Sequence, residues 1–266
     1  MKRLDTYLVE NGLIKSREKA KDSIQKGLVK VNGVVITKGS FIVNDDAKVE
    51  YNSTDAMPFV GKGGLKLEKA IKDFNIDFKD KYVLDVGAST GGFTHCALQH
   101  GAVYVWAVDV GVNQLDEILR NNSQVCSMEE CDIRTLPENA IPRKVDLIVG
   151  DLSFISLTLI APHLPKFLSN NGEMVLLIKP QFEAGKEFVS KNGIVKDPKV
   201  HVNILKRIES CFNNQSLFLK GLNFAPINNR NKNIEYISLF TFTNTQSNID
   251  LRTVVNNAFS FQKSLK

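Results

Sequence analysis

The stretch DVGASTGGFT, residues 85–94, follows an apolar run and predicts a glycine-rich turn between a strand and a helix. Glycine permits a tight turn and lets a ligand approach the backbone closely. The dinucleotide fingerprint G-x-G-x-x-G is not met, because Ser89 stands at the second glycine position, and no Gly-Lys-Ser/Thr of a phosphate loop follows. Asp85 would repel a pyrophosphate, so it indicates either an orienting role in the loop or a partner for a cationic amino-acid group.

Apolar, β-branched runs recur along the rest of the chain and alternate with segments long enough for helices. The first four runs cover residues 83–88, 103–110, 145–152 and 174–180. Such alternation predicts an α/β domain with a parallel sheet covered on both faces. Two later runs, 216–224 and 234–242, lie close together and predict a terminal hairpin of the same sheet, followed by a helix over 249–259.

The first fifty residues follow a different pattern. The expected elements are helices over 3–11 and 17–26, a hairpin at Asn32-Gly33 and a strand near 47–51. A polar segment with Pro58 is typical of a linker, and a helix is expected from about Leu65. We therefore predict a small α+β domain over residues 1–52, a linker over 53–62 and a larger domain over 63–266.

Positive charge is concentrated in the small domain. The whole chain carries 34 Lys or Arg against 29 Asp or Glu, a net charge of +5. Residues 1–43 hold nine Lys or Arg and four acids, which also gives +5. A local surplus of cations attracts phosphate and favours nucleic acid as a partner. The candidates for this surface are Arg3, Arg17, Lys19, Lys21 and Lys26; a solvated helix face is the alternative for any one of them.

Acids stand at the predicted ends of the first three strands. Asp109 lies 22 residues beyond Gly87, where an acid suits the two hydroxyl donors of a ribose. Asp132 and Ile133 follow the presumed third strand, where an adenine edge would lie. Together with Asp85, and without a basic phosphate clamp, these acids predict a pocket for S-adenosylmethionine. A helix N-cap is the alternative for each acid taken alone.

Charged residues also follow the fourth and fifth strands. Asp151 and Lys179 each come directly after an apolar run, and ligands of open α/β sheets bind at the carboxyl ends of strands. A buried lysine needs a partner, and Asp151 is the natural one. Glu235 begins the last apolar run and is out of place there unless it serves a site. A structural ion-pair network is the alternative to an active site.

Other features argue against several classes of protein. No stretch approaches the roughly 18 apolar residues of a membrane span, and charges throughout the N-terminal stretch argue against a secretory signal. The four cysteines are Cys96, Cys126, Cys131 and Cys211, and no histidine lies close enough to Cys126 and Cys131 for metal-like spacing. We therefore expect no metal site and a reduced, cytoplasmic compartment.

Longer motifs resemble a known family. The segment RLDTYLVENGLIKSREKAKDSIQKGLVKVNG resembles an S4 RNA-binding domain. Six further motifs in combination resemble the TlyA family, also known as hemolysin A: FVGKGGLKL, DVGASTGGFT, GDLSFISL, LIKPQFEAGKE, GIVKDP and NIEYISL. The resemblance covers nearly the whole chain. It implies a Rossmann-like, FtsJ-type methyltransferase domain with a mostly parallel seven-stranded sheet, preceded by the S4 domain.

The resemblance also implies a Lys-Asp-Lys-Glu catalytic tetrad, with S-adenosylmethionine as donor and no metal. The matching residues are Lys66, Asp151, Lys179 and Glu235. Lys179 would accept the proton of a ribose hydroxyl or stabilise the alkoxide, and Lys66 would orient the hydroxyl or a phosphate. With the acids above, the cofactor-binding candidates are Asp85, Gly87, Ala88, Ser89, Gly91, Gly92, Phe93, Asp109, Asp132, Ile133 and Asp151.

Two positions depart from the family pattern. Lys62, a further candidate for RNA contact, stands where relatives commonly have Arg, which keeps the cation but loses a fork of donors. The linker has Pro58-Phe59-Val60 where some relatives have a Trp-Val pair.

The expected function is 2′-O-methylation of a cytidine in ribosomal RNA. The family precedent is the large-subunit 23S RNA and, in some members, also the small-subunit 16S RNA. The chain starts almost directly at the predicted S4 helix, which favours the large subunit. We expect ribosomal subunits as partners, no membrane and a monomer. The alternatives are an inactive RNA-binding assembly factor, a membrane-lytic protein with an exposed apolar segment, and a nicotinamide-linked oxidoreductase, which Ser89 and the strand-end acids disfavour.

Overall fold

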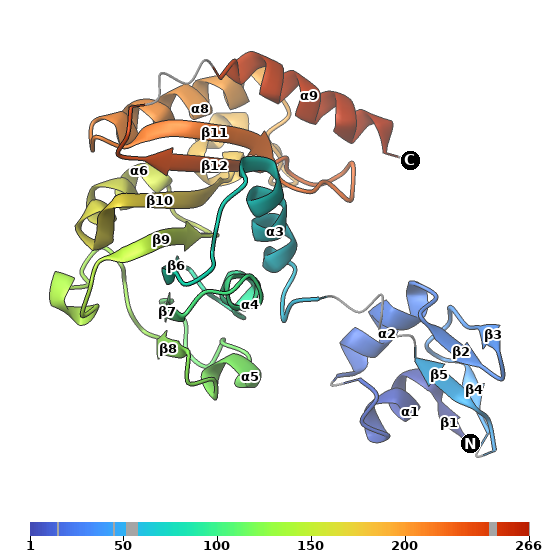
Figure 1. The fold of residues 1–266 in the computed structure, drawn as a ribbon. Helices are drawn as coiled ribbons and strands as arrows, with labels where there is room; N and C mark the ends of the chain where they lie inside the picture. Colours follow the sequence, from blue (N-terminus) through green and yellow to red (C-terminus); the bar gives the residue numbers. More distant parts are fainter. Residues whose placement is uncertain (15, 45, 52–57, 245–248, 266) are drawn as a thin grey trace. The chain divides into compact units, whose positions relative to one another are not determined.

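The computed structural model describes residues 1–14, 16–44, 46–51, 58–244 and 249–265, which form two compact units (Figure 1). The N-terminal unit runs from Met1 to Pro58 and the C-terminal unit from Phe59 to Lys266. The boundary between the units falls within the predicted linker, of which residues 53–57 lie outside the described residues. In the described ranges no helix is both long enough and apolar enough to cross a membrane.

The N-terminal unit combines two short helices with short antiparallel strands. Its elements are β1 (Lys2–Arg3), α1 (Leu4–Glu10), α2 (Arg17–Gln25), β2 (Val29–Val31), β3 (Val34–Val35), β4 (Ile42–Val43) and β5 (Val49–Tyr51). β1 pairs with β4, and β2 lies between β3 and β5. The Ser16 hydroxyl caps α2, and Asn32 and Gly33 have φ angles of 51° and 80°, as the predicted hairpin turn requires. The two-residue strands β1 and β4 were not predicted.

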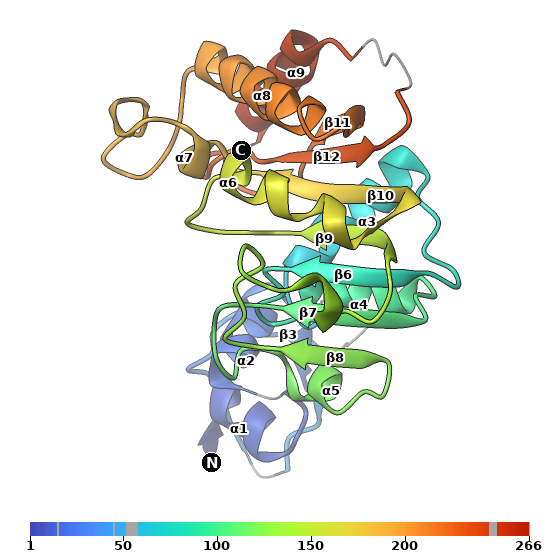
Figure 2. The ribbon, with the colours of Figure 1, turned by 90° about the vertical axis from the view of Figure 1, so that its left-hand side faces the viewer.

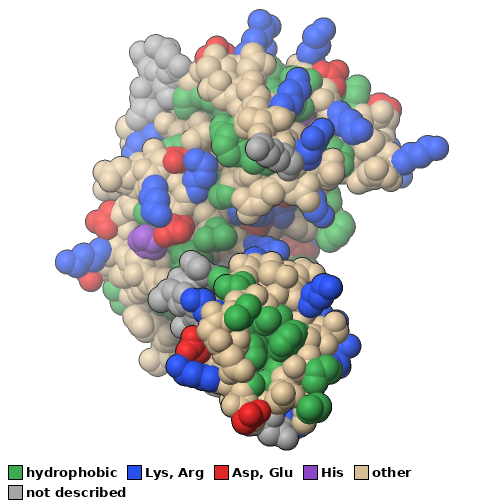
Figure 3. All heavy atoms as spheres, turned by 90° about the vertical axis from the view of Figure 1, so that its right-hand side faces the viewer, with side chains coloured by type: hydrophobic (Ala, Val, Ile, Leu, Met, Phe, Trp, Pro, Cys, Tyr) green, Lys and Arg blue, Asp and Glu red, His purple; other side chains and the backbone are tan. Residues whose placement is uncertain are grey.

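Apolar side chains form a small core and also one exposed patch in this unit. Leu4, Leu8, Ala20, Ile24 and Val29 are fully buried at its centre. The exposed large apolar residues of the unit include Val34, Val35, Phe41 and Ile42. Figure 3 shows apolar side chains gathered on one face of the unit, with Lys and Arg side chains at its margin.

The C-terminal unit is built around one seven-stranded sheet. The strands are β6 (Tyr82–Val86), β7 (Tyr104–Val108), β8 (Val125–Met128), β9 (Val145–Gly150), β10 (Leu168–Ile178), β11 (Phe218–Phe224) and β12 (Tyr236–Thr241). Their order across the sheet is β11-β12-β10-β9-β6-β7-β8; β12 runs antiparallel to both of its neighbours, and the other neighbouring strands are parallel. The prediction of a mostly parallel sheet that ends in a hairpin of its last two strands is therefore confirmed.

Alternate residues of the strands belong to different hydrophobic clusters, of which two are large. Figure 2 shows the strands of the sheet in order from β12 to β8. Val83 and Val105 belong to a cluster with α3 (Gly63–Phe74) and α4 (Gly92–Gln99). Leu84 and Trp106 belong to a second cluster, with α8 (Pro198–Asn213) and α9 (Leu251–Ser264). This period-2 division is what a sheet buried on both faces requires of its sequence.

Full-length helices occupy fewer of the strand connections than the segment lengths suggested. The short elements are α5 (Glu117–Arg120), α6 (Leu157–Ile160), α7 (Pro180–Glu183) and 3₁₀ turns at Glu138–Ala140, Ala161–His163, Pro165–Phe167 and Lys186–Phe188. The expectation of helices between β8 and β9 and between β9 and β10 is thus wrong, apart from the single turn of α6. Proline explains both cases, because Pro137, Pro142, Pro162 and Pro165 interrupt these segments and proline lacks the N–H that a helix interior needs.

Asp85 ties the first strand of the sheet to the helix that follows it. Its side chain is wholly buried on β6, and its Oδ2 accepts hydrogen bonds from the Thr94 N–H at 3.0 Å and the Thr94 hydroxyl at 2.6 Å. Its Oδ1 has no hydrogen-bond partner among the described residues. Burial raises the pKa of Asp85 to about 7, although the bonds from Thr94 favour the ionised form.

We expect Asp85→Asn to gain stability relative to the wild type as the pH rises from about 4 to about 7. A group with a raised pKa binds more protons folded than unfolded, so the wild type loses unfolding free energy in this window. Asparagine cannot ionise and escapes that loss. The measurement is urea unfolding of cofactor-free protein, followed by the fluorescence of Trp106, the one tryptophan of the chain.

The control for this experiment is Asp80→Asn, which alters an exposed carboxylate of the same unit. A difference between Asp85→Asn and the wild type that stays constant with pH would contradict a raised pKa.

Candidate functional site

A cavity of about 560 Å³ opens at the carboxyl edge of the sheet, beside the ends of β6, β7 and β9. The predicted cofactor residues that line it are Gly87, Ser89, Asp109, Asp132, Ile133 and Asp151. Gly87 has a φ angle of +80°, and a Cβ there would lie 3.4 Å from Leu152, so the turn requires glycine. Among the residues that line the cavity, three are carboxylates and one, Arg134, is a cation. This balance disfavours a pyrophosphate and suits a cationic ligand.

Asp109 anchors the glycine-rich turn. Its carboxylate accepts hydrogen bonds from the Ser89 N–H and the Gly111 N–H, each at 2.7 Å. Ser89 has a φ angle of 47°, which a residue other than glycine adopts only when its surroundings hold it there. A carboxylate has about four lone-pair sites. Asp109 can therefore still accept from two hydroxyl groups in the cavity.

Asp132 is already engaged by its neighbour Arg134. The Arg134 Nε lies 3.0 Å from both Asp132 oxygens, and the Arg134 N–H donates to Oδ1 at 2.9 Å. These bonds hold the pKa of Asp132 below its usual range. Ile133 is buried beside it. The Asp132 oxygens are therefore occupied by Arg134, and Asp132 contributes to the wall of the cavity.

The other predicted cofactor residues form the turn behind the cavity: Asp85, Ala88, Gly91, Gly92 and Phe93. A Cβ on Gly91 would lie 2.2 Å from a methyl group of Leu119, and one on Gly92 would lie 2.9 Å from the Gly64 nitrogen. Phe93 is buried against Gly63. None of these five residues lines the cavity, and the carboxylate of Asp85 bonds Thr94.

The four residues of the predicted tetrad lie together at the same edge of the sheet. Lys66 is on α3, Asp151 and Lys179 directly follow β9 and β10, and Glu235 directly precedes β12. The Lys66 Nζ lies 3.0 Å from Asp151 Oδ2 and 2.8 Å from Glu235 Oε2. The Lys179 Nζ lies 2.7 Å from Asp151 Oδ1. The charges therefore alternate along a chain, Lys179–Asp151–Lys66–Glu235, and sum to zero.

Lys179 is the most deeply placed member of the tetrad, with 8% of its side chain exposed. Besides this ion pair with the Asp151 carboxylate, its Nζ donates hydrogen bonds to the Ser153 hydroxyl at 2.7 Å and to the Asp151 backbone oxygen at 3.3 Å. One carboxylate and two hydrogen-bond acceptors therefore surround the nitrogen. Ser153 was not predicted, although its position two residues after Asp151 could have suggested it.

The two acids of the tetrad stabilise the charged form of Lys66. Burial acts to lower this pKa, but the attraction of Asp151 and Glu235 outweighs burial, and the pKa of Lys66 is raised. Glu235 also accepts a hydrogen bond from the Gln181 amide at 3.3 Å. Lys66 is therefore a fixed positive charge, held between two acids that come from distant parts of the sequence.

Glu183 joins the two loops that carry Asp151 and Lys179. Its side chain, on α7, is 2% exposed. It accepts hydrogen bonds from the Ser156 hydroxyl at 2.6 Å and the Leu157 N–H at 2.7 Å, and it pairs with Arg207 of α8 at 3.3 Å. The sequence analysis missed this residue. An acid three residues after Pro180 looks like any acid of a surface helix, and only tertiary packing identifies it as a link.

Two phenylalanines lie beside the tetrad. Phe154 is 90% exposed and has a φ angle of 63°, an unfavourable conformation for a bulky residue. Its ring lies 4.9 Å from the ring of Phe182, and the Lys179 Nζ lies 5.9 Å from the centre of the Phe182 ring. A strained backbone that presents an apolar ring to solvent next to reactive groups indicates a functional surface.

All six predicted RNA-binding residues have exposed side chains: Arg3, Arg17, Lys19, Lys21, Lys26 and Lys62. Five of them lie in the N-terminal unit, and Lys62 precedes α3 in the C-terminal unit. Arg3 and Arg17 pair with Asp5, and Lys26 pairs with Asp22 at 2.6 Å.

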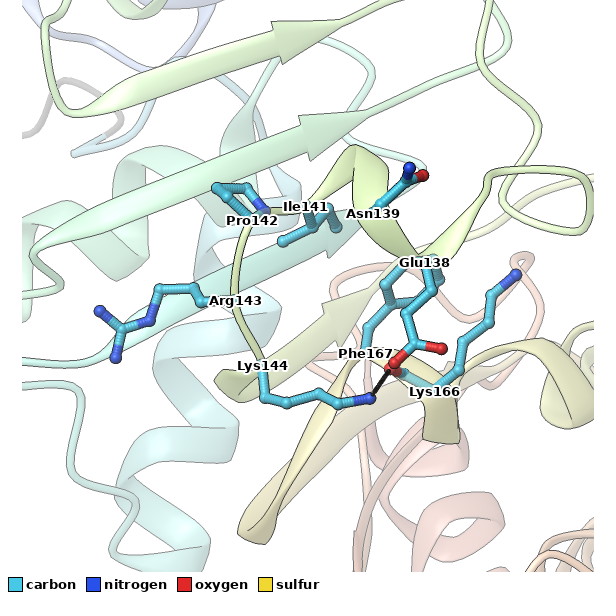
Figure 4. Close-up of a pocket in the computed structure, with 8 residues that line it drawn as sticks. All are labelled: Glu138, Asn139, Ile141, Pro142, Arg143, Lys144, Lys166 and Phe167. Atoms are coloured by element: carbon cyan, nitrogen blue, oxygen red, sulfur yellow. Dashed lines mark hydrogen bonds and ion pairs between the residues drawn. The ribbon is translucent and has the colours of Figure 1, made fainter.

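A larger cavity, of about 660 Å³, lies at the opposite edge of the sheet, where β9 and β10 begin (Figure 4). Lys144 pairs with Glu138 at 2.6 Å, and Lys166 donates to the Leu136 backbone oxygen at 2.6 Å. None of the predicted catalytic or cofactor-binding residues lines this cavity. Its size alone therefore does not make it the candidate site.

Comparison with known proteins agrees with the division of the chain into two units. The FtsJ-like methyltransferase family matches residues 59–242, and the S4 domain family matches residues 2–49. YqxC of Bacillus subtilis, named as a candidate rRNA methyltransferase, is 44% identical over 236 residues, which are 88% of this chain and 84% of that protein. The 16S/23S rRNA (cytidine-2′-O)-methyltransferase TlyA of Mycobacterium tuberculosis is 36% identical over 245 residues, 92% of this chain and 90% of that protein.

A solved structure is similar over almost the full length. It is that of a candidate hemolysin from Streptococcus thermophilus, with a TM-score of 0.77 and 37% identity, and the match covers 98% of this chain and 97% of that one. The chain therefore belongs to the TlyA, or hemolysin A, family of FtsJ-like methyltransferases that carry an S4 domain.

Proposed function

We propose that the chain transfers the methyl group of S-adenosylmethionine to the ribose 2′-hydroxyl of a cytidine in ribosomal RNA. The observation that carries this proposal is the tetrad, in which a nearly buried lysine amine stands beside a cavity lined by carboxylates. Named relatives act on ribosomal RNA, and TlyA of Mycobacterium tuberculosis is named for both the 16S and the 23S RNA. Both ribosomal subunits are therefore candidate substrates.

The cavity at the carboxyl edge suits S-adenosylmethionine. When bound, this cofactor supplies an electrophilic methyl group on a positively charged sulfur. The spare acceptor capacity of Asp109 fits the two hydroxyls of a ribose. Asp151 lines the same cavity and belongs to the tetrad, so it connects the two parts of the site. The shared residue supports placement of the reacting groups close together, from which much of the rate comes.

Lys179 is the residue that we propose takes the proton from the 2′-hydroxyl. This role requires the neutral amine of Lys179, which would accept the proton of the hydroxyl as the ribose oxygen bonds to the methyl group and the sulfur leaves with the electron pair of the broken carbon–sulfur bond. The Asp151 carboxylate and the two hydrogen-bond acceptors around Nζ would stabilise the ammonium group that forms. Lys66 remains charged between two acids and is placed to orient the hydroxyl or a neighbouring phosphate.

The same residues support a cytoplasmic monomer as the acting form. All four members of the tetrad come from one chain, so the site needs no second copy to be complete. We place the activity in the cytoplasm, because that is where a substrate of assembled ribosomal subunits occurs.

We expect Lys179→Ala to lower kcat for methyl transfer by about 10² to 10⁴-fold, because the proton acceptor is lost. The measurement uses labelled S-adenosylmethionine with separate large and small subunits from a strain that lacks the enzyme, followed by mapping of 2′-O-methyl sites. The matched control is Lys220→Ala, which removes an exposed lysine paired with Glu173 and should keep full activity.

Two results would overturn parts of the proposal. Unchanged activity of Lys179→Ala would exclude the proposed proton acceptor. If the wild type bound subunits but transferred no methyl group to either, the function would be wrong and the assembly-factor alternative would be favoured.

We also expect Phe154→Ala to raise KM for ribosomal RNA by about 5- to 150-fold, the range for loss of one base stacked on an aromatic ring. The reason is the exposed ring that Phe154 presents beside the tetrad. Steady-state kinetics give KM for the RNA, and calorimetry gives the affinity for S-adenosylmethionine. Phe261→Ala, on α9, is the control. A loss of cofactor affinity as large as the rise in KM would contradict a role in RNA binding.

A further inference from the structure

A buried carboxylate lies beneath the basic surface of the N-terminal unit. Asp5 is in the first turn of α1, and its side chain is wholly buried. An acid on a surface that attracts phosphate is unexpected, because its charge opposes the positive potential on which binding depends. The proposed catalytic mechanism does not use it. The arrangement of its neighbours accounts for its presence.

Asp5 binds two of the arginines predicted to contact RNA. The Arg3 Nε donates to Oδ1 at 3.1 Å and the Arg3 Nη2 to Oδ2 at 2.9 Å. The Arg17 Nη2 donates to the same Oδ2 at 3.4 Å. The carboxylate itself is fixed, because the Asp5 N–H donates to the Gly39 oxygen at 3.1 Å and the Thr6 hydroxyl donates to Oδ1 at 3.3 Å. One acid therefore fixes two guanidinium groups from different elements.

Among the residues that the structure describes, both arginines have N–H donors without a protein partner. A guanidinium group has five N–H bonds, and Arg3 uses two of them, on one edge, for Asp5. The edge formed by its two terminal nitrogens is the one that binds phosphate through two hydrogen bonds. The side chains of Arg3 and Arg17 are 46% and 56% exposed. Each arginine is thus held from below by Asp5 and open to solvent above.

The two arginines leave this place positively charged: two guanidinium groups around one carboxylate give a net charge of +1. The stem of Lys21, one helical turn after Arg17, passes nearby, since a Cβ on Gly39 would lie 3.5 Å from the Lys21 Cγ and 3.5 Å from the Asp5 Cβ. The hydrogen bond from Arg3 holds the pKa of Asp5 at about 2 despite burial, so the acid stays ionised near neutral pH. One arginine would be enough to neutralise the carboxylate, so the second arginine is not explained by charge neutralisation.

We propose that Asp5 is a positioning residue that holds Arg3 and Arg17 side by side as a clamp for one backbone phosphate of ribosomal RNA. The inference rests on the proposed function, which supplies RNA as the partner. Two guanidinium groups that are already ordered lose less side-chain entropy on binding than two free ones. In this proposal, the entropy saved by ordered arginines contributes more to the binding free energy than the negative charge of Asp5 takes from the attraction to phosphate.

The test compares two substitutions that remove the same negative charge from the full-length protein. Asp5→Asn frees both arginines, whereas Glu18→Gln alters an exposed acid in the first turn of α2. We expect Asp5→Asn to weaken binding to isolated large subunits about tenfold, and Glu18→Gln to leave binding unchanged or tighter. The slope of log K against log salt should fall by about one for Asp5→Asn, which reports the loss of one phosphate contact.

Kinetics distinguish this role from a structural one. Asp5→Asn should raise KM for the subunit and leave kcat at saturating subunit unchanged, because the tetrad is not touched. Arg3→Lys, which keeps the charge but loses the fork of donors, should reproduce the rise in KM even if Asp5→Asn unfolds the N-terminal unit. Binding by Asp5→Asn and Arg3→Lys as tight as that of the wild type would overturn the proposal.

The outcome for Asp5 is separable from the outcome for the proposed function. If the wild type binds subunits without transferring methyl groups, the methylation proposal fails, while the binding comparison still decides the role of Asp5.

Discussion

The assembly of the C-terminal unit depends on the tetrad, whose four charged side chains alternate in sign and are largely buried. An ionised lysine removed from water is costly unless an acid compensates it, and breaking such a pair costs about 3–5 kcal/mol. Here the compensating partners come from α3 and from the ends of three strands. No single member is favourable alone, so the helix and the three strands have to be correctly placed together. The chemistry that we propose uses the same residues, because it needs the Lys179 amine held in place beside the cavity.

Much of this site could be predicted from the sequence, because a charged residue at the end of an apolar run marks the end of a buried strand. Asp151 and Lys179 each follow a long apolar run, and Glu235 stands at the start of another. A charge at such a position conflicts with burial, and this conflict can be recognised from the sequence alone. Lys66 is different. It lies on α3 between Lys62 and Lys69, and nothing in the local pattern separates it from its neighbours. Only the family resemblance suggested it, and only packing brings it within 3.0 Å of Asp151.

What could not be predicted depends on contacts between distant segments. Glu183 and Asp5 look like ordinary surface acids in the sequence, yet each is buried and holds groups from other elements. For Asp85 the sequence left two roles open and indicated neither its complete burial nor its two bonds from Thr94. Segment length suggested helices between the central strands, whereas prolines limit them to single turns. Tertiary packing decides the surroundings of the three acids, whereas the absence of longer helices follows from proline, a local feature of the sequence.

The reversed direction of β12 has a consequence for how the protein is made. Because this strand is antiparallel, the residue just before it reaches the edge at which the parallel strands end, and it does so between β10 and β11. A nascent chain released only as far as β11 holds three members of the tetrad, with Lys66 lacking one of its two acids. In the folded sheet β12 lies between β10 and β11, which both precede it in the sequence. Nearly the whole chain must therefore be synthesised before the four charges of the tetrad can come together.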